Sequence, residues 1–280
     1  MNSPALSQVA VFGLGIIGSR CAQNLDAANY SVKTWNRTPK DGARTSPLEA
    51  AEGSEFLLFY LKDGNAMREV VSQLTPHLKP SQTLLNHSTI DLETTRWLAD
   101  VCAEAGCRFL DAPFTGSKVA AGNGALVYYV GGDQETLEHS RSVMEVTSKE
   151  IKHLGDVGAA TVIKLATNLI SATTVQALSE AMAIATAHGI SPELLTESVA
   201  SNACGSALAQ MKLPTMAEGN YDTHFSLENM LKDSRFALQL AEEAGIETPG
   251  IKTTSEAMEK RCKNGDGQLD FSALFKAYRE

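Results

Sequence analysis

The chain has 280 residues, a mass of 29.9 kDa and 43% hydrophobic residues, which suits a protein of two domains, or of one large domain, with a sizeable core. Its net charge of -9 makes non-specific binding to nucleic acid unfavourable, because an acidic surface repels phosphate backbones. The five cysteines include no Cys-x-x-Cys pair and the six histidines include no His-x-His or His-x-x-x-His pair, so we expect neither a disulfide framework nor a metal site.

Two further features concern the location of the chain. Residues 1–8 are polar and precede an expected strand directly, which predicts that no signal peptide is present. The longest apolar region, residues 159–190, contains Lys164, Asn168 and Glu180, so it predicts a buried helix rather than a membrane span. With the odd number of cysteines, these features predict a cytoplasmic protein.

The first half of the chain alternates strand-like runs with helical periodicity. Short apolar or alternating runs predict strands at residues 8–12, 31–35, 56–61, 83–86, 108–111, 126–130 and 149–153. Helical periodicity predicts helices at residues 17–29, 66–74, 92–105 and 134–144. Repeated strand–helix units predict an α/β fold with a Rossmann-type, doubly wound parallel sheet and right-handed crossovers.

The second half changes to an almost wholly helical pattern. A long helix is expected at residues 159–188, and shorter helices at 192–199, 206–211, 227–244, 253–264 and 271–278. We place the domain boundary after Gly158, which gives a nucleotide-binding domain at 1–158 and an all-helical C-terminal domain at 159–280. The long apolar helix needs more cover than a small helical domain supplies, so we expect a homodimer or homotetramer.

A glycine-rich turn follows the first expected strand and opens the first expected helix. Its residues match the pattern G-x-G-x-x-G and are Gly13, Leu14, Gly15, Ile16, Ile17 and Gly18. Gly13 allows the tight turn, Gly15 lets the backbone approach a pyrophosphate, and Gly18 lets helix and strand pack closely. With the free N–H groups at the start of the helix, the turn predicts a dinucleotide site; the alternative is a glycine-rich turn without a ligand.

The end of the second expected strand indicates which dinucleotide binds. An NAD site usually has Asp or Glu there to hold the ribose 2′-hydroxyl, whereas this chain has Asn36, Arg37 and Thr38. A carboxylate would repel a 2′-phosphate, while Arg37 can pair with it. NADP is therefore favoured over NAD, and the alternative is that Arg37 is a solvated surface charge.

Two pairs of polar residues lie on the expected helices of the second half. Lys164 and Asn168 are four residues apart and share one helix face among apolar neighbours. Partial desolvation would lower the pKa of Lys164 toward the range useful for proton transfer, although a lysine at such a site can also extend its head into water. Lys232 and Asp233, taken alone, indicate a solvated charge pair.

Polar residues also follow two of the expected strands. Residues 111–118 offer hydroxyls, backbone N–H groups around Gly116 and a lysine, which suit a small carboxylate as well as they suit a plain surface turn. Ser88 and Thr89 have the same ambiguity. Both segments remain candidates, because ligands of open α/β sheets bind at the carboxyl ends of the strands.

Taken in this order, the segments resemble the β-hydroxyacid dehydrogenase family over nearly the whole chain. Residues 13–18 match its cofactor motif, and residues 111–117 resemble its substrate loop, DAPVSGG. Residues 155–168 resemble its catalytic motif, G-x-x-G-x-x-x-x-x-K-x-x-x-N, and residues 232–233 its C-terminal K-D motif. The Asn-Arg-Thr triplet and residues 225–233 are most similar to the glyoxylate/succinic semialdehyde reductase branch, which uses NADPH.

The resemblance implies roles for individual residues. Lys164 would be the catalytic acid/base, with Asn168 beside it. Contacts with the cofactor would come from Leu61, Thr89 and Lys232 as well as from the glycine-rich turn and the Asn-Arg-Thr triplet. The residues implied in substrate binding are Ser88, Thr115, Gly116, Ser117, Asn168 and Asp233.

Three positions depart from the pattern of the family. The loop has Phe114-Thr115 where the family often has Val-Ser, Asn86-His87 replaces Asp-Met, and Lys62 stands where proline is common. Thr115 keeps the hydroxyl and adds a methyl group that narrows the pocket. These changes bear on the choice of substrate and leave the expected chemistry intact.

The expected reaction is hydride transfer from NADPH to a small aldehyde that carries a carboxylate, such as glyoxylate or succinic semialdehyde, or the reverse reaction on a β-hydroxyacid. Lys164 would protonate the developing alkoxide, with Asn168 positioning it. The alternatives are another reaction on the same fold, such as that of an imine reductase or a 6-phosphogluconate dehydrogenase, and a non-catalytic NADP-binding scaffold. Imine reductases generally lack the lysine, and 6-phosphogluconate dehydrogenases have a longer C-terminal region.

Overall fold

The computed structural model describes residues 7–279. Its contacts divide the chain into two compact units, the first ending at Lys164 and the second beginning at Leu165. The division falls inside the long helix α7 (Ala159–Ala187), whereas the boundary predicted after Gly158 lies just before that helix. Each unit is described by itself below.

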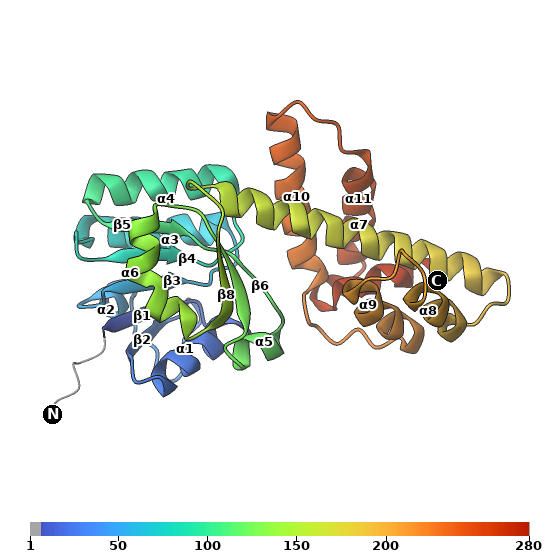
Figure 1. Cartoon of the computed structure of the whole chain (residues 1–280), viewed down its shortest axis with the longest axis horizontal. Helices are drawn as coiled ribbons and strands as arrows, with labels where there is room; N and C mark the ends of the chain where they lie inside the picture. The colour runs from blue at the N-terminus through green and yellow to red at the C-terminus, as the bar shows by residue number, and fades with distance from the viewer. Residues whose placement is uncertain (1–6, 280) are drawn as a thin grey trace. The chain divides into compact units, whose positions relative to one another are not determined.

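A parallel sheet of five strands in the order β2-β1-β3-β4-β5 forms the centre of the first unit (Figure 1). The strands are β1 (Gln8–Phe12), β2 (Ser31–Trp35), β3 (Phe56–Phe59), β4 (Thr83–Asn86) and β5 (Arg108–Asp111). Their register pairs the last residue of each strand with the last residue of its neighbours. All five carboxyl ends therefore share one edge, and the strand order reverses at β1, where ligands of such sheets bind.

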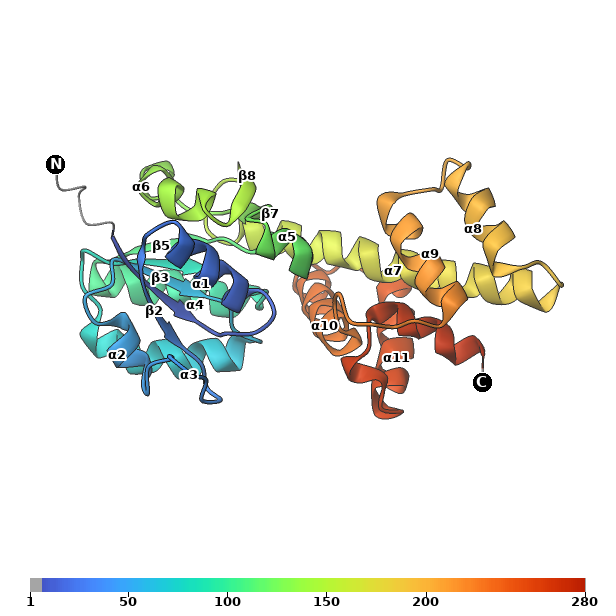
Figure 2. The same ribbon diagram turned by 90° about the horizontal axis from the view of Figure 1, so that it is seen from below.

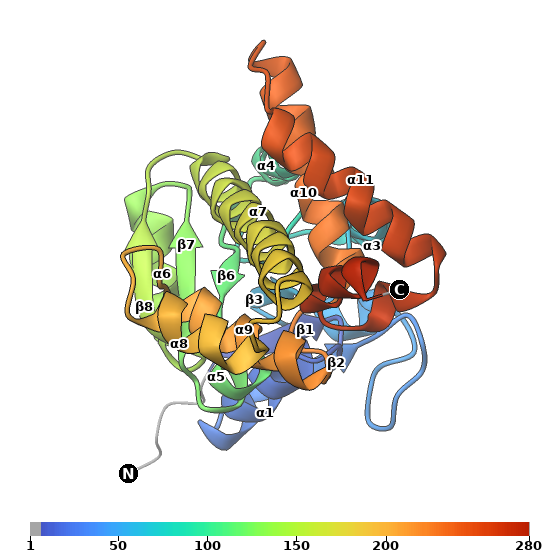
Figure 3. The ribbon, with the colours of Figure 1, turned by 90° about the vertical axis from the view of Figure 1, so that its right-hand side faces the viewer.

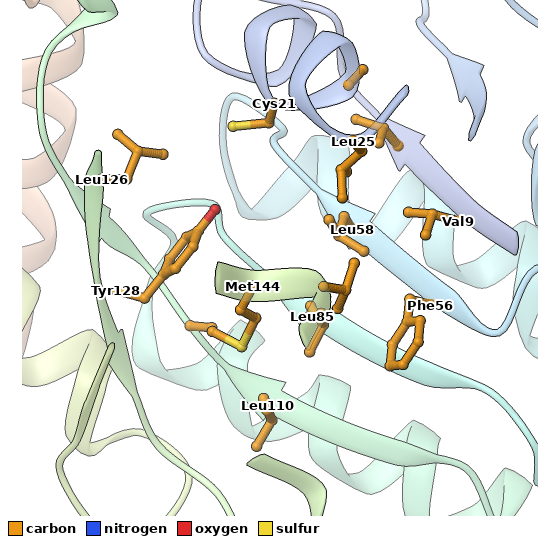
Figure 4. Packing of buried hydrophobic residues seen from close by; sticks show 14 of the residues in the cluster. Val9, Cys21, Leu25, Phe56, Leu58, Leu85, Leu110, Leu126, Tyr128 and Met144 are labelled. Atoms are coloured by element: carbon orange, nitrogen blue, oxygen red, sulfur yellow. The ribbon is translucent and has the colours of Figure 1, made fainter. Parts of the chain in front are cut away.

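Helices cover both faces of this sheet, so the predicted doubly wound fold is confirmed. One hydrophobic core lies between the sheet and the helices α1 (Gly18–Ala27) and α6 (Gln134–Glu145). A second core lies between the opposite face and the helices α2 (Pro47–Ala51), α3 (Gly64–Leu74) and α4 (Leu92–Ala105). Figure 4 shows the first core, in which Leu58, Leu85 and Leu110 come from neighbouring strands.

Burial on both faces explains why the central strands are continuous apolar runs. In β3, Phe56 and Leu58 lie in the first core, while Leu57 and Phe59 lie in the second. Successive side chains of a strand point to opposite faces, so every residue of such a strand is in contact with a helix layer. A run without alternation is therefore the pattern that this architecture requires.

The last three strands of the first unit form a separate sheet. They are β6 (Phe114–Thr115), β7 (Leu126–Val130) and β8 (Ser148–His153), in the order β6-β7-β8. β6 is antiparallel to β7, and β7 is parallel to β8. The sequence predicts β7 and β8 as strands but does not separate them from the parallel sheet, and it predicts a loop at β6, because two residues are too few to show a pattern. A short helix, α5 (Lys118–Gly122), joins β6 to β7.

The second unit consists of helices, as predicted. After α7 come α8 (Pro192–Ala200), α9 (Ala207–Glu218), α10 (Leu227–Glu243) and α11 (Pro249–Lys263). α8 packs beside α9 and α10 beside α11 (Figures 2 and 3). The short 3₁₀ segments of the chain are η1 (Thr75–His77), η2 (Asp266–Gln268) and η3 (Phe271–Tyr278).

Several helices begin where the sequence predicts. Ser191 caps α8 by accepting a hydrogen bond from the backbone N–H of Leu194 at 3.2 Å. Other predicted bounds differ from the structure: β3 ends at Phe59 rather than Leu61, and α11 begins at Pro249 rather than Thr253. α9 continues to Glu218 through Pro214, because its buried face contributes to the core of the unit, and residues 271–278 form a 3₁₀ helix rather than an α-helix. α2 and α5 were not predicted, because five residues are too few for helical periodicity.

Two features are absent from residues 7–279. In that part of the chain, every helix is too short or too polar to cross a membrane. The same residues contain no group of three or more His, Cys, Asp or Glu side chains that could hold a metal ion.

Candidate active site

The glycine-rich turn joins β1 to α1 at the carboxyl edge of the parallel sheet. Gly13 has a φ of +96°, and a Cβ there would collide with the carbonyl oxygen of Tyr60. A Cβ on Gly18 would collide with the carbonyl oxygen of Gly13. Gly15 differs from both, because a Cβ there would meet nothing within 4 Å. Two glycines are thus needed for packing, and the third faces open space that a ligand can enter.

The donors expected for a pyrophosphate are present at this turn. α1 begins at Gly18 and has no side-chain cap on its first N–H groups. Its first turn contains no acidic residue. The Ser19 and Arg20 N–H groups bond to the carbonyls of Gly15 and Ile17, so the other N–H groups of the turn and the positive end of the helix dipole are the features that fit a dinucleotide phosphate.

The end of β2 is tied to the glycine-rich turn through Asn36. The Asn36 carboxamide accepts a hydrogen bond from the backbone N–H of Leu14 at 2.8 Å and donates one to the carbonyl of Thr38 at 2.7 Å. Lys40, which the sequence analysis did not single out, donates to the carbonyl of Leu14 at 2.6 Å. Arg37 and Thr38 are exposed. Asn36 thus fixes the conformation of the glycine-rich turn. The segment after β2 also carries the cations Arg37 and Lys40.

The ends of β3 and β4 are joined by Ser88. Its hydroxyl accepts a hydrogen bond from the backbone N–H of Leu61 at 2.7 Å and donates one to the carbonyl of Phe59 at 3.2 Å. Ser88 is buried, so its observed hydrogen bonds are structural. Its contact with substrate, and the contacts of Leu61 and Thr89 with cofactor, stay predictions.

His87 is fully buried beside Ser88, between the rings of Tyr60 and Tyr128. Its Nδ1 lies 2.8 Å from the carbonyl oxygen of Ala112, so this nitrogen carries the proton of the neutral ring. Its Nε2 has no hydrogen-bond partner among residues 7–279. Burial lowers the pKa of His87 from 6.5 to about 4, with the Ala112 carbonyl acting in the opposite direction.

The predicted substrate loop leaves β5 and forms β6. Thr115 and Gly116 are exposed, and Gly116 has a φ of +143°. A Cβ at Gly116 would lie 2.8 Å from a methyl group of Leu126, so glycine is required there. The Ser117 hydroxyl accepts a hydrogen bond from the Ala120 N–H at 3.3 Å and so caps α5. The loop therefore presents the Thr115 hydroxyl and the backbone around Gly116.

The predicted catalytic helix is α7. Lys164 is half-buried in its second turn. The turn before it is fixed by Asp111, whose carboxylate accepts hydrogen bonds from the N–H and hydroxyl of Thr161, each at 2.9 Å. From the sequence, Asp111 is only part of a loop motif, and Thr161 has no predicted role. Their link was not predictable, because the two residues are far apart in the chain.

The second unit contains a buried polar network around Asp233. The Asn168 Nδ2 donates a hydrogen bond to Asp233 Oδ2 at 2.6 Å, and Lys232 Nζ lies 2.7 Å from Asp233 Oδ1. The Asp233 side chain is 1% exposed and that of Lys232 is 17% exposed. The prediction made from this pair alone, a solvated charge pair, is therefore wrong, because α10 turns Asp233 toward α7. Within the second unit, the structure brings together three of the predicted site residues.

Comparison with known proteins identifies the family. The profile described as the NAD binding domain of 6-phosphogluconate dehydrogenase matches residues 8–155, and the profile described as NAD-binding of NADP-dependent 3-hydroxyisobutyrate dehydrogenase matches residues 158–278. Glyoxylate/succinic semialdehyde reductase 1 of Arabidopsis thaliana is 30% identical over 284 residues, which cover 97% of this chain and 98% of that protein. The chain belongs to the β-hydroxyacid dehydrogenase family. It is therefore an NAD(P)-binding oxidoreductase.

Solved structures agree with this assignment. A 3-hydroxyisobutyrate dehydrogenase of Mycobacterium tuberculosis, solved with L-serine, has a TM-score of 0.90 and 25% identity, with 98% of this chain and 100% of that chain covered. An imine reductase from Pseudomonas sp. has a TM-score of 0.62 and 21% identity, with 97% and 99% covered. The second likeness concerns the fold alone.

Three residues that support the candidate site in the structure were not predicted from the sequence. Lys40 lies in a loop with no regular pattern, so no periodicity marks it. Asp111 and Thr161 act through a tertiary contact that spacing along the chain does not reveal. The signal that could have found Asp111 is an acidic residue at the end of an otherwise apolar strand, where a buried carboxylate needs a partner.

Proposed function

We propose that this enzyme is an NADPH-dependent reductase of small aldehydes that carry a carboxylate, such as glyoxylate and succinic semialdehyde. The same site would oxidise a β-hydroxyacid in the reverse direction. The chemistry that a bound nicotinamide supplies is hydride transfer to the aldehyde carbon. The observation that carries the proposal is the Asn168–Asp233–Lys232 network on the helices that bear the catalytic and C-terminal motifs.

The preference for NADP is supported by the charges at the end of β2. Arg37 and Lys40 are cations there, and positions 36 to 38 include no acid that would hold a ribose 2′-hydroxyl. Thr38 adds a hydroxyl. An arginine pairs well with a phosphate monoester because its planar donors match the phosphate oxygens. These residues would bind the 2′-phosphate.

The substrate carboxylate would bind to the loop after β5. Thr115 offers a hydroxyl, and the backbone around Gly116 offers N–H groups, so a carboxylate can be held without a buried cation. The Ser117 hydroxyl accepts from the Ala120 N–H and can still donate its hydrogen to a carboxylate. The Ser88 hydroxyl donates to the Phe59 carbonyl, so it would donate to substrate only by giving up that bond. The methyl group of Thr115 would narrow the substrate pocket, which favours a substrate of small cross-section.

Lys164 would protonate the alkoxide that forms as the aldehyde is reduced. A general acid works best when its pKa is near the working pH, and partial burial moves a lysine in that direction. Because Asp233 accepts from the Asn168 amide nitrogen, the Asn168 amide oxygen stays available as an acceptor, one helical turn after Lys164. In that orientation Asn168 would hold the substrate hydroxyl or the lysine ammonium.

The test is NADPH oxidation, followed at the nicotinamide absorbance, with glyoxylate, succinic semialdehyde and a cyclic imine as separate substrates and with NADH as a parallel cofactor. Turnover of an aldehyde acid with NADPH and little with NADH supports the proposal. Turnover of the imine alone would assign the chain the reaction of an imine reductase. Tight NADPH binding without turnover of any substrate would favour a non-catalytic role.

We also propose that the protein forms a homodimer or homotetramer. Ile170 and Ile184 of α7 are 61% and 63% exposed, and their spacing of fourteen residues places them near one face of the helix. A second copy of the chain would cover them. Light scattering of the purified protein measures the assembly, and a monomer at micromolar concentration contradicts this proposal.

A further inference from the structure

A single carboxylate connects the end of β5 to the start of the lysine helix. Asp111 is the last residue of β5 and is fully buried. One carboxylate oxygen accepts the backbone N–H of Thr161 at 2.9 Å, and both oxygens lie 2.9 Å from the Thr161 hydroxyl. Thr161 is in the first turn of α7. Asp111 therefore takes the place of an N-terminal cap for this helix, although it lies 50 residues earlier in the chain.

This cap differs from the others in the protein. α3, α4 and α6 are capped by Asp63, Asp91 and Asp133, each of which accepts the N–H of a residue three positions later. Those caps are local and partly exposed, so they stabilise only the helix that they begin. A buried cap from a strand fixes where the helix lies relative to that strand. The Asp111 contact is thus a tertiary constraint as well as a cap.

The Thr161 hydroxyl extends the constraint to a third element. It lies 3.0 Å from the hydroxyl of Thr95 on α4, and Thr95 in turn lies 3.2 Å from the carbonyl of Asp91. Thr95 and Thr161 are both buried. Three elements of the first unit therefore meet at the first turn of α7 through hydrogen bonds that water does not reach.

Burial of this carboxylate is unfavourable by itself. Burial raises the pKa of Asp111 to about 6, against the opposing effect of its hydrogen bonds from Thr161 and Gly158. A neutral side chain could fill the same space without that penalty. The carboxylate nevertheless fits this position well, because it only accepts hydrogen bonds and its Oδ2 accepts from both the N–H and the hydroxyl of Thr161 while Oδ1 lies within reach of the same hydroxyl.

Lys164 follows Thr161 by three residues, so the two lie on the same side of α7 and the position of the first turn sets the position of the lysine. Asp111 also precedes the loop that presents Thr115, and the N–H of the next residue, Ala112, is bonded to the carbonyl of Asn86 at 2.8 Å. The side chain of Asp111 thus fixes the turn before the lysine, while its backbone, bonded to Gly131 at 2.9 and 2.7 Å, helps to fix the root of the loop. We propose that Asp111 and Thr161 are positioning residues that set the location of Lys164 relative to the loop, and this rests on the proposed function.

The first test compares Thr161→Val with Thr161→Ser and with Thr186→Val as a control on the same helix, where the Thr186 hydroxyl bonds only to the carbonyl of Met182. Thr161→Val should lower kcat by roughly 3- to 30-fold, because small displacements of catalytic groups have large effects on rate. The NADPH dissociation constant should stay within about twofold. Thr161→Ser should restore the rate, and Thr186→Val should leave it unchanged.

The second test does not depend on activity. Lysines of the cofactor-free protein are dimethylated with ¹³C-formaldehyde and a borohydride reductant, and the signal of Lys164 is assigned from its loss in Lys164→Arg. Displacement of the lysine in Thr161→Val should move this signal and its titration midpoint, and Thr161→Ser should return both. If Thr161→Val does not fold, Thr161→Ala, which fills less space, takes its place in both tests.

The outcomes separate the two proposals. If the wild-type protein turns over no aldehyde acid, the proposed function fails and the NMR signal alone decides the positioning role. If Thr161→Val is less stable to heat but keeps the wild-type kcat and the wild-type Lys164 signal, Asp111 and Thr161 serve only the stability of the fold, and the inference is overturned.

Discussion

The carboxylate of Asp233 accepts a hydrogen bond of 2.6 Å from the Asn168 amide nitrogen while its other oxygen lies 2.7 Å from the ammonium of Lys232. An ionised carboxylate only accepts hydrogen bonds, so it determines which way the Asn168 amide faces. A residue that flips readily on its own is thereby held in one orientation. This relationship links the C-terminal motif of the family to its catalytic motif.

We expect Asp233→Asn to lower kcat by roughly 10- to 100-fold, because the Asn168 amide loses the acceptor that fixes its orientation. The matched control is Glu259→Gln, which removes an exposed carboxylate from the ion pairs with Arg235 and Lys263. Steady-state kinetics with the aldehyde substrate provide the measurement. Equal kcat values for Asp233→Asn and the wild type would show that the amide needs no such support.

Lys164→Ala should lower turnover by about 10²- to 10⁴-fold, the usual contribution of a general acid. Lys164→Arg should be nearly as inactive, because a guanidinium keeps the charge but does not release its proton near neutral pH. NADPH affinity, measured by titration calorimetry, should stay close to that of the wild type for both variants. Loss of cofactor binding instead would make the lysine a structural residue.

Arg37→Gln should weaken NADPH binding by about 10-fold, since an exposed charge-assisted hydrogen bond to a phosphate contributes on this scale. NADH binding should not change, because NADH lacks the 2′-phosphate. Lys79→Gln removes another exposed cation from the same unit and serves as the control. The proposed preference is contradicted if both cofactors lose affinity equally.

Acid should weaken the fold through His87. Burial lowers the pKa of the folded-state His87 to about 4, whereas the unfolded chain takes up the proton near 6.5. Stability is therefore fully present above pH 6.5 and is lost as the pH falls toward 4, with a loss on the order of 3 kcal/mol from this group.

His87→Phe isolates this effect, because the new ring can stay stacked between Tyr60 and Tyr128. Urea unfolding between pH 4 and 7.5 should show a smaller loss of unfolding free energy on acidification for the variant than for the wild type. Parallel curves for the two proteins would mean that His87 does not titrate as its burial implies.

The sequence predicted most of the fold because the local patterns agree with the tertiary structure. β1, β2, β4 and β5 have the predicted bounds. The buried strands of the sheet give apolar runs, whereas β2 lies at the edge of the sheet and shows an alternating pattern. The separate sheet of β6, β7 and β8 was not foreseen. Which strands pair depends on contacts such as the bridge between Asp111 and Gly131, and periodicity does not report them.

The candidate site also contains some residues that the sequence predicted and others that it did not. Gly13, Gly18 and Lys164 follow from motifs, in which the spacing along the chain carries the information. The burial of the Asp233 side chain was not predicted, because it results from α10 packing against α7 and not from the neighbours of Asp233 in sequence. Lys40 and Thr161 were missed for the same reason, because a hydrogen bond between distant segments leaves no trace in a local pattern.

The residues that lead into the short strand β6 are held by backbone hydrogen bonds, and this affects how a substrate would bind to the loop. Two backbone hydrogen bonds hold the residues just before β6. The Ala112 N–H donates to the carbonyl of Asn86, and the Tyr129 N–H donates to the carbonyl of Pro113. A loop that is already ordered loses little conformational entropy when it takes up a substrate. The amides of Ala112 and Tyr129 should therefore exchange slowly with deuterium in the free protein. A substrate would then bind to a preformed loop, and the loop would not need to fold when the substrate binds.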